Sequence, residues 1–179
     1  PYIDVRNSFN SFLPSDVNDG LAHRLVDSWL DRLKNHPELH DKVEFEVAQT
    51  ALDFDFDAFF QQHYGERISG AEFSNFKDSA RHLTRKALDL GNSATLKTAL
   101  GKITALEDLQ AVAQQQQTSS SQLSLLRRAQ VLLADCKRLG TLPFAIVARH
   151  AFIAEILLRT AVKREALKPE RLDQFKRGL

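Results

Sequence analysis

The chain has little of what builds the commonest active sites. Its 179 residues include one cysteine, no methionine and only 7 glycines. A single cysteine, Cys136, excludes an intrachain disulfide and fits a reducing compartment, so we expect a cytoplasmic protein in which Cys136 is a small buried residue on a helix. The glycines form neither GxGxxG nor GxxxxGK[ST], which excludes the usual glycine loops that hold phosphate groups.

The chain also lacks a strong charge of one sign. Lys and Arg number 24 and Asp and Glu number 23, so the formal net charge at pH 7 is +1. Because no overall field attracts a polyanion, we expect no nucleic acid and no membrane among its partners. The longest apolar run, around 142–148, is too short to cross a bilayer. Hydrophobic residues make up 43% of the chain, enough for the core of one domain.

No metal site is expected. The histidines are scattered and form no HExxH motif; they are His23, His36, His40, His63, His82 and His150. His36 and His40 have the HxxxH spacing, but the helix before them is predicted to end at 35–37, so the pattern does not put the two imidazoles on one helical face. The acidic run Asp53, Asp55 and Asp57 resembles the start of a calcium loop. It lacks the glycine at the sixth position and the glutamate at the twelfth, so it does not predict calcium binding.

Two segments predict a small β element near the N-terminus. Residues 2–9 contain the strand formers Tyr2, Ile3 and Val5. Apolar and acidic side chains alternate over 43–47, as in a half-buried strand, and the alternation of aspartate with phenylalanine over 53–57 predicts either a continuation of that strand or an acidic turn into a short helix. The strand is expected over 43–54. We therefore expect an extended, β-containing part over 1–56 and a helical part over 57–179, within a single domain.

The rest of the chain is expected to be helical. Leu21, Leu25, Trp29 and Leu33 recur at every fourth position of a helix that begins after Ser15 or Asp16 and ends at 35–37. Further helices are predicted at 58–64, after a capping box at 69–72, at 94–114, at 122–138 with Gly140 as its stop, at 143–163 and from Pro169 onward. The 143–163 segment is apolar on nearly all sides, which predicts a central helix. The expected fold is mainly α, a bundle-like domain in which five or six helices pack around the 143–163 helix.

The opening segment supplies one candidate site. If residues 2–9 form a strand, Asp4, Arg6, Ser8 and Asn10 share one face. That face either donates and accepts hydrogen bonds with a ligand or a neighbouring domain, or is the solvated side of an edge strand.

A second candidate site lies in the most apolar helix. Arg149, His150 and Glu155 are its embedded polar groups, and a buried charge is costly unless it is paired. Arg149 and His150 therefore either line a pocket for an anionic group, or belong to a structural ion pair or a partly exposed edge of the helix.

Three segments carry a family resemblance: PYIDVRNSFNSFLP (1–14), LHDKVEFEV (39–47) and GTLPFAIVARHAFIAE (140–155). Together they resemble a bacterial group of large phosphoenolpyruvate-synthase-like proteins, within the family of phosphoenolpyruvate synthase and pyruvate phosphate dikinase. The resemblance implies a parent with an ATP-grasp-like nucleotide domain and a swivelling phosphohistidine domain. ATP and Mg²⁺ would bind there and not in this chain. No catalytic residue carries over, because His150 lies in VARHAFIA and not in a glycine- and serine-containing loop.

The resemblance implies a function for the chain. It starts at Pro1 and ends just after a basic run, so we expect a fragment of a larger enzyme. It would be a non-catalytic central domain that supports or lines the acceptor site, with the nucleotide-binding and phosphohistidine domains as its partners. In a rival hypothesis, Arg6 and Arg149 bind an anionic acceptor. The alternative from another class is a free-standing helical protein-interaction adaptor unrelated to phosphoryl transfer.

Overall fold

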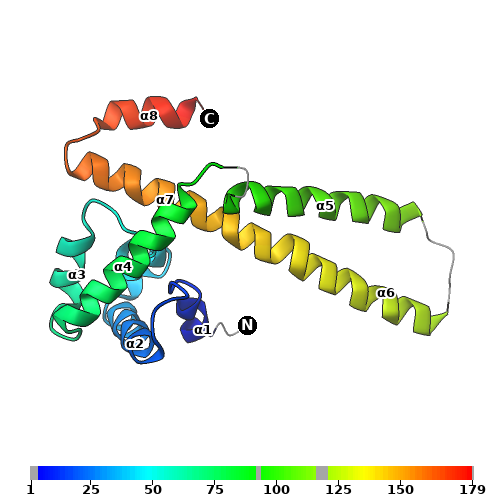
Figure 1. The fold of residues 1–179 in the computed structure, drawn as a ribbon, viewed down its shortest axis with the longest axis horizontal. Helices are drawn as coiled ribbons and strands as arrows, with labels where there is room; N and C mark the ends of the chain where they lie inside the picture. Colours follow the sequence, from blue (N-terminus) through cyan, green and yellow to red (C-terminus); the bar gives the residue numbers. More distant parts are fainter. Residues whose placement is uncertain (1–3, 92–93, 116–120, 179) are drawn as a thin grey trace. The chain divides into compact units, whose positions relative to one another are not determined.

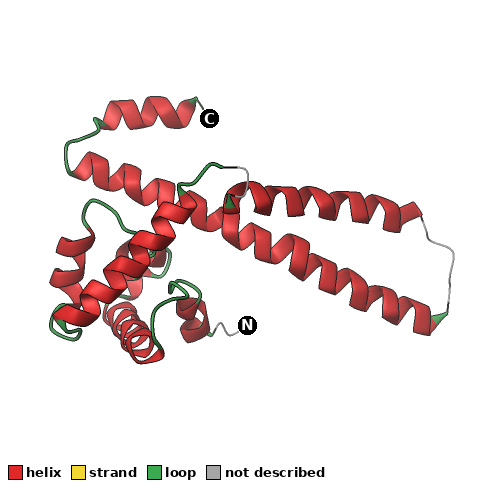
Figure 2. Ribbon diagram, in the orientation of Figure 1, coloured by secondary structure: helices red, strands yellow, loops and turns green. Residues whose placement is uncertain are grey.

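The protein is mainly α-helical. A computed structural model describes residues 4–91, 94–115 and 121–178. Every regular element in these ranges is a helix (Figure 2), which confirms the expected fold class. The chain divides into two compact units, Pro1–Arg85 with Phe152–Leu179, and Lys86–Ala151. These are not the two parts, 1–56 and 57–179, into which the sequence pattern divides.

Figure 1 labels the helices of both units and colours them in chain order. The first unit holds α1 (Val5–Asn10), α2 (Asp19–Asn35), the 3₁₀ turn η1 (Pro37–Leu39), the π-helical turn η2 (Val43–Val47), α3 (Phe56–Tyr64), nearly all of α4 (Gly70–Ala87), the C-terminal part of α7 (Leu142–Lys163) and α8 (Pro169–Arg177). The second unit holds α5 (Thr95–Gln115), α6 (Gln122–Asp135), the π-helical segment η3 (Cys136–Thr141) and the first part of α7.

An aromatic core holds the first unit together. Trp29 of α2 is fully buried, with ring centroids of Phe9 at 6.0 Å and Phe76 at 6.4 Å. Phe56 and Phe60 of α3 complete this cluster. Since each such ring removes 150–250 Å² from water, these side chains dominate the packing of the unit.

The helix starts follow the capping rules. Asn18 accepts a hydrogen bond from the Leu21 N–H over 3.0 Å, so α2 begins at Asp19 and not directly after Ser15 or Asp16. The predicted capping box of α4 is confirmed, because the Ser69 N–H donates to Glu72 and the Glu72 N–H donates to the Ser69 hydroxyl.

The predicted β element is wrong within the described residues. The Asp4 carboxylate accepts from the Asn7 N–H over 3.0 Å and caps α1, which buries Phe9 in the core. Tyr2 and Ile3 lie outside the described residues. In the 43–54 segment, the Ala48 N–H donates to the Val43 carbonyl and closes a π-helical turn. A strand needs a neighbour to pair its backbone, and a helical 5–10 segment supplies none.

Gly140 does not end a helix. The helix is continuous from Gln122 to Lys163 and passes Gly140 within η3. A Cβ atom at this position would lie 3.0 Å from Leu106 Cδ2 of α5, so the missing side chain lets α5 approach closely. The glycine therefore serves packing inside the second unit, and a C-cap was the wrong interpretation.

The sequence predicts that the 143–163 helix is buried at the centre of the fold, but α7 is buried on part of its surface only. Phe144 is 67% exposed, and Ile153, Ile156 and Thr160 are the buried positions of its C-terminal part. By length and composition alone, the Gln122–Lys163 helix is able to cross a membrane, with an 18-residue window of mean hydropathy 1.6. This is weak evidence, because α7 also carries Arg149 and Glu155. The absence of a membrane partner stays a prediction.

Candidate functional site

The first unit contains a polar cavity of about 140 Å³, which we call the α3–α7 cavity. Its wall combines η2 and the segment that follows it with α3 and the C-terminal part of α7. Carboxylates, an amide and cations line it beside the rings of Phe45 and Phe59. Such a mixture of apolar walls and a few convergent polar groups is typical of ligand sites.

The Asp55 carboxylate is the best-paired acid of the cavity. Its side chain is 8% exposed, and Oδ1 accepts from Arg164 Nε over 2.6 Å. Oδ2 forms a second ion pair with Lys163. The hydrogen bond from Lys163, together with that from Arg164, lowers the pKa of Asp55 below its usual value and outweighs the effect of burial.

The neighbouring Asp53 carboxylate is in a different electrostatic state. Asp53 Oδ1 accepts from the Asp55 N–H over 2.8 Å, which shapes the turn before α3. Burial raises the pKa of Asp53 to about 6, with a smaller contribution from the charge of Asp55. Lys163 opposes this rise only in part. Two carboxylates two residues apart thus have pKa values shifted in opposite directions.

Gln49 supplies the amide. It is 5% exposed, and its Nε2 donates to the Phe56 carbonyl over 2.9 Å. Its Oε1 is buried and has no hydrogen-bond partner among the described residues. A buried acceptor without a donor costs about 1–3 kcal/mol.

Arginine side chains and one tyrosine hold the η2 wall of the cavity in place. Arg32 Nε donates to the Glu46 carbonyl over 2.7 Å, and the buried Tyr64 hydroxyl donates to the Val47 carbonyl over 2.5 Å. The Arg159 guanidinium lies over the Phe45 ring, 4.5 Å from its centroid. The contacts from Arg32 and Tyr64 satisfy carbonyls that a π-helical turn leaves without the usual α-helical partners, and the contact from Arg159 holds the Phe45 ring.

Glu155 takes part in a network that explains its position without a ligand. Arg159 Nε donates to Glu155 Oε1 over 2.7 Å, and Lys176 of α8 pairs with the same carboxylate over 3.0 Å. The hydrogen bond from Arg159 lowers the pKa of Glu155. Glu155 is thus a paired charge, as expected for a carboxylate embedded in an apolar helix, whereas the ion pair considered for Arg149 and His150 stays a prediction.

The residues predicted on the opening segment lie on a helix and not on a strand. Asp4 is the N-cap of α1, and Arg6 pairs with Asp27 of α2 over 2.6 Å at an exposed position. On α1, Arg6 and Asn10 are four residues apart and share a face, whereas Asp4 precedes the helix. The single face predicted for all of them is therefore not present, and their role in ligand or domain contact stays a prediction.

Arg149 and His150 belong to the second unit. The His150 Nδ1–H donates to the Ile146 carbonyl over 2.7 Å, which leaves Nε2 to accept from the Thr95 hydroxyl over 3.1 Å. Arg149 is half-buried, and burial lowers its pKa. The contact with Thr95 gives His150 a packing role between α5 and α7. The α1 residues belong to the first unit, so the structure assigns the two predicted sets to different units.

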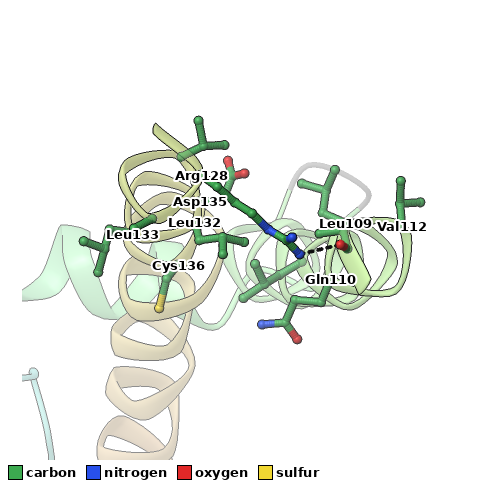
Figure 3. Close-up of a pocket in the computed structure, with 12 residues that line it drawn as sticks. Leu109, Gln110, Val112, Arg128, Leu132, Leu133, Asp135 and Cys136 are labelled. Atoms are coloured by element: carbon green, nitrogen blue, oxygen red, sulfur yellow. Dashed lines mark hydrogen bonds between the residues drawn. The ribbon is translucent and has the colours of Figure 1, made fainter. Parts of the chain in front are cut away.

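The second unit carries an apolar groove of about 850 Å³ between α5 and α6, which we call the α5–α6 groove. Leu109 and Val112 line it from α5, and Leu132 and Leu133 from α6 (Figure 3). Arg128 Nη2 donates to the Ala113 carbonyl over 2.5 Å, the dashed contact in Figure 3.

Cys136 also lines the α5–α6 groove and is exposed, so the expectation of a buried cysteine is wrong. Its helix presents apolar side chains on more than one face, and the side facing the groove is not covered by the described residues.

No pattern in the sequence singles out the residues that make the α3–α7 cavity. The pattern places Asp53 and Asp55 in a strand or an acidic turn and excludes a calcium loop, and it assigns no role to Gln49 or Arg164. The alternation of aspartate with phenylalanine over 53–57 could have indicated the cavity, because it places carboxylates beside aromatic rings of the core. Across residues 4–91, 94–115 and 121–178, no three His, Cys, Asp or Glu side chains are grouped as a metal site requires.

Comparisons with known proteins leave the resemblance untested: no family model, no curated protein and no solved structure matches this chain.

Proposed function

We propose that the chain is a non-catalytic helical domain of a phosphoenolpyruvate-synthase-like, ATP-dependent phosphotransferase of the cytoplasm. It would support or line the site of the phosphoryl acceptor. ATP and Mg²⁺ would be held by a nucleotide-binding domain, and a phosphohistidine domain would carry the phosphoryl group. Those two domains are the partners proposed for this chain.

The observation that supports this proposal is a contact between two of the segments that carry the resemblance. The rings of Phe45, from 39–47, and Phe152, from 140–155, meet edge to face with centroids 5.9 Å apart. The first of these segments also lines the α3–α7 cavity through Phe45 and Glu46. Two segments that carry the resemblance are thus in contact at the wall of one cavity of the first unit, which supports a role for this domain beside the acceptor site.

The genomic sequence around the chain provides the first test. The same reading frame should encode an ATP-grasp-like domain and a phosphohistidine loop in a glycine- and serine-containing context. The parent protein should then form an acid-labile phosphohistidine from radiolabelled ATP, which pyruvate discharges if it is the acceptor.

A variant of this chain separates a supporting role from a catalytic one. In the parent, Phe152→Ala should leave labelling of the histidine intact and slow its discharge, because the change loosens a wall of the α3–α7 cavity. Phe54→Ala truncates an exposed ring and is the matched control. If the Phe152→Ala protein folds but the histidine is no longer labelled, a non-catalytic role is contradicted. If the reading frame encodes neither of the two domains, the proposal is wrong.

One observation favours the second candidate, a free-standing helical adaptor. The second unit exposes aliphatic side chains on α5 and α6: Leu100, Leu109, Val112, Leu123, Leu125, Leu126, Val131, Leu132 and Leu133. Together they expose on the order of several hundred Å² of apolar surface, a size that marks interaction sites.

The adaptor predicts a start codon directly before Pro1 and a stop codon after Leu179. It also predicts that a photocrosslinker at Leu133 traps one defined protein and that Leu109→Glu abolishes the product. A crosslinker at Lys102, outside the α5–α6 groove, is the control position. Equal products from both positions would contradict the adaptor.

A further inference from the structure

The α3–α7 cavity has an excess of acceptors over donors. Gln49 cannot satisfy its Oε1 by rotating its amide, because Nε2 already donates to the Phe56 carbonyl and a flipped amide would set two oxygens against each other. The buried Oε1 therefore requires a donor that the described residues do not provide.

The charged groups of the cavity wall also favour a ligand that donates hydrogen bonds. The wall carries the carboxylates of Glu46, Asp53 and Asp55 and the cations of Arg159 and Lys163. Both cations are engaged, Lys163 with Asp55 and Arg159 with Glu155 outside the wall. Asp55 is likewise engaged by Lys163 and Arg164, whereas Asp53 forms no ion pair among the described residues and accepts from the Asp55 N–H. An added anion would therefore meet cations already neutralised, whereas an added cation would meet the Asp53 carboxylate.

The size of the cavity restricts the ligand. About 140 Å³ holds roughly five groups of the size of a water molecule, at about 30 Å³ each. A nucleotide does not fit such a space, but an amine or guanidinium head group does. The rings of Phe45 and Phe59 line the same space, and their faces already attract cations, since Arg159 and Arg32 lie over them at 4.5 Å and 5.7 Å.

We propose that the α3–α7 cavity binds a small organic cation, a protonated primary amine or a guanidinium. Its N–H groups donate to Gln49 Oε1 and to the Asp53 carboxylate, and its alkyl part lies against Phe45 and Phe59. The proposal rests on residues of the first unit alone, so it can be tested separately from the proposed role in phosphoryl transfer.

The burial of Asp53 gives the site a dependence on pH. Because its pKa is raised to about 6, the carboxylate becomes neutral below that pH and loses its attraction for a cation. The charged groups that face it are Glu46 from η2, Asp55 from the segment before α3, and Arg159 and Lys163 from α7. Binding should therefore weaken as the pH falls from 7.5 to 5.

The test is titration calorimetry on the whole chain with propylammonium and methylguanidinium. Propanol and propionate are the neutral and anionic comparisons. We expect saturable binding of at least one cation at pH 7.5, with a Kd of at most about 1 mM, equivalent to roughly −4.1 kcal/mol. Neither comparison compound should bind measurably. Equal binding of propanol or propionate would overturn the proposal, as would no saturable binding of either cation.

Two variants test whether the Asp53 carboxylate and Gln49 Oε1 bind the cation. Asp53→Asn keeps an oxygen that can accept from the Asp55 N–H and removes the charge, and it should raise the Kd at least tenfold. Gln49→Met removes the orphaned oxygen at similar volume and should weaken binding to a similar degree. Asp57→Asn, a change at an exposed acid paired with Lys77, is the matched control and should leave the Kd unchanged. If both cavity variants fold and bind the cation as tightly as the unaltered chain, the site is not the one proposed.

Discussion

Arg164 Nε lies 2.6 Å from Oδ1 of Asp55, although 109 positions separate the two residues. Arg164 directly follows α7, and Asp55 directly precedes α3. The contact fixes the end of one helix to the start of another within the first unit. The next residue, Glu165, has a φ of 58°, the left-handed conformation in which many helices end, so the chain turns away from α7 immediately after this contact.

Replacing Asp55 tests the strength of this contact. Asp55→Asn should lower the free energy of unfolding at pH 7 by about 1–2 kcal/mol, less than the 3–5 kcal/mol typical of a broken buried pair. The reason is that Lys163 and Arg164 are 70% and 52% exposed and regain water when the carboxylate is lost. Urea unfolding at pH 7 measures the difference.

The pH dependence of the Asp55 variant provides its control. The pKa of Asp55 is lowered in the folded state, so its stabilisation is present above the unfolded value and is lost as the pH falls through the folded value. The two proteins should therefore approach equal stability in acid, once the pH lies below the lowered folded pKa of Asp55. If the two proteins still differ in stability at that low pH, the effect of the substitution comes from the shape of the side chain and not from its charge.

The sequence predicted the helices of the first unit better than its cavity. The spacing of Leu21, Leu25 and Trp29 and the capping box at Ser69 are local patterns, and both are found as expected. The α3–α7 cavity depends instead on Asp55 meeting Arg164, a contact between distant segments that no periodicity reveals. The β element failed for a related reason, since alternation in 43–47 is compatible with a helical turn when no second strand is available.

Asp53 should show the opposite pH behaviour. Burial raises its folded pKa to about 6, above the unfolded value of about 3.9, so its ionisation costs stability progressively as the pH rises from about 4 to about 6, and the full cost is present above pH 6. Asp53→Asn should therefore raise the free energy of unfolding by about 1–2 kcal/mol at pH 8. The gain should disappear near pH 4, where the folded carboxyl is protonated and the unfolded one begins to be. Urea unfolding at both pH values measures this, and an equal gain at both would contradict the assigned cause.

Phe60 of α3 and Phe152 of α7 differ in how deeply they are buried. Phe60 is fully buried among Phe73, Phe76 and Tyr64, so Phe60→Ala should cost about 3–5 kcal/mol. Phe152 of α7 is only half-buried, and Phe152→Ala should cost about 1–2 kcal/mol. Thermal unfolding of both variants gives the comparison. If Phe152→Ala cost as much as Phe60→Ala, the original expectation of a central 143–163 helix would be restored.

Arg6 should contribute little to stability. Its ion pair with Asp27 is exposed on both sides, and such pairs are worth about 0–1 kcal/mol. Arg6→Ala should leave the melting temperature almost unchanged, whereas Asp4→Ala should cost about 1 kcal/mol because it removes the cap of α1. A large loss of stability on Arg6→Ala would show that Arg6 has a structural role and would weaken its candidacy for a ligand or domain contact.

Tyr64 connects the core to the wall of the α3–α7 cavity. Its buried hydroxyl donates to the Val47 carbonyl over 2.5 Å, and burial raises its pKa above the usual value. Tyr64→Phe keeps the ring and leaves a buried carbonyl without its donor, which should cost about 1–3 kcal/mol. Because Val47 ends η2, hydrogen exchange should also become faster at the Ala48 N–H, which closes that turn. His40→Phe, at an exposed position in the same unit, is a control that should change neither quantity. Unchanged exchange at Ala48 alongside a lower stability would show that the hydroxyl stabilises the core but does not hold the cavity wall.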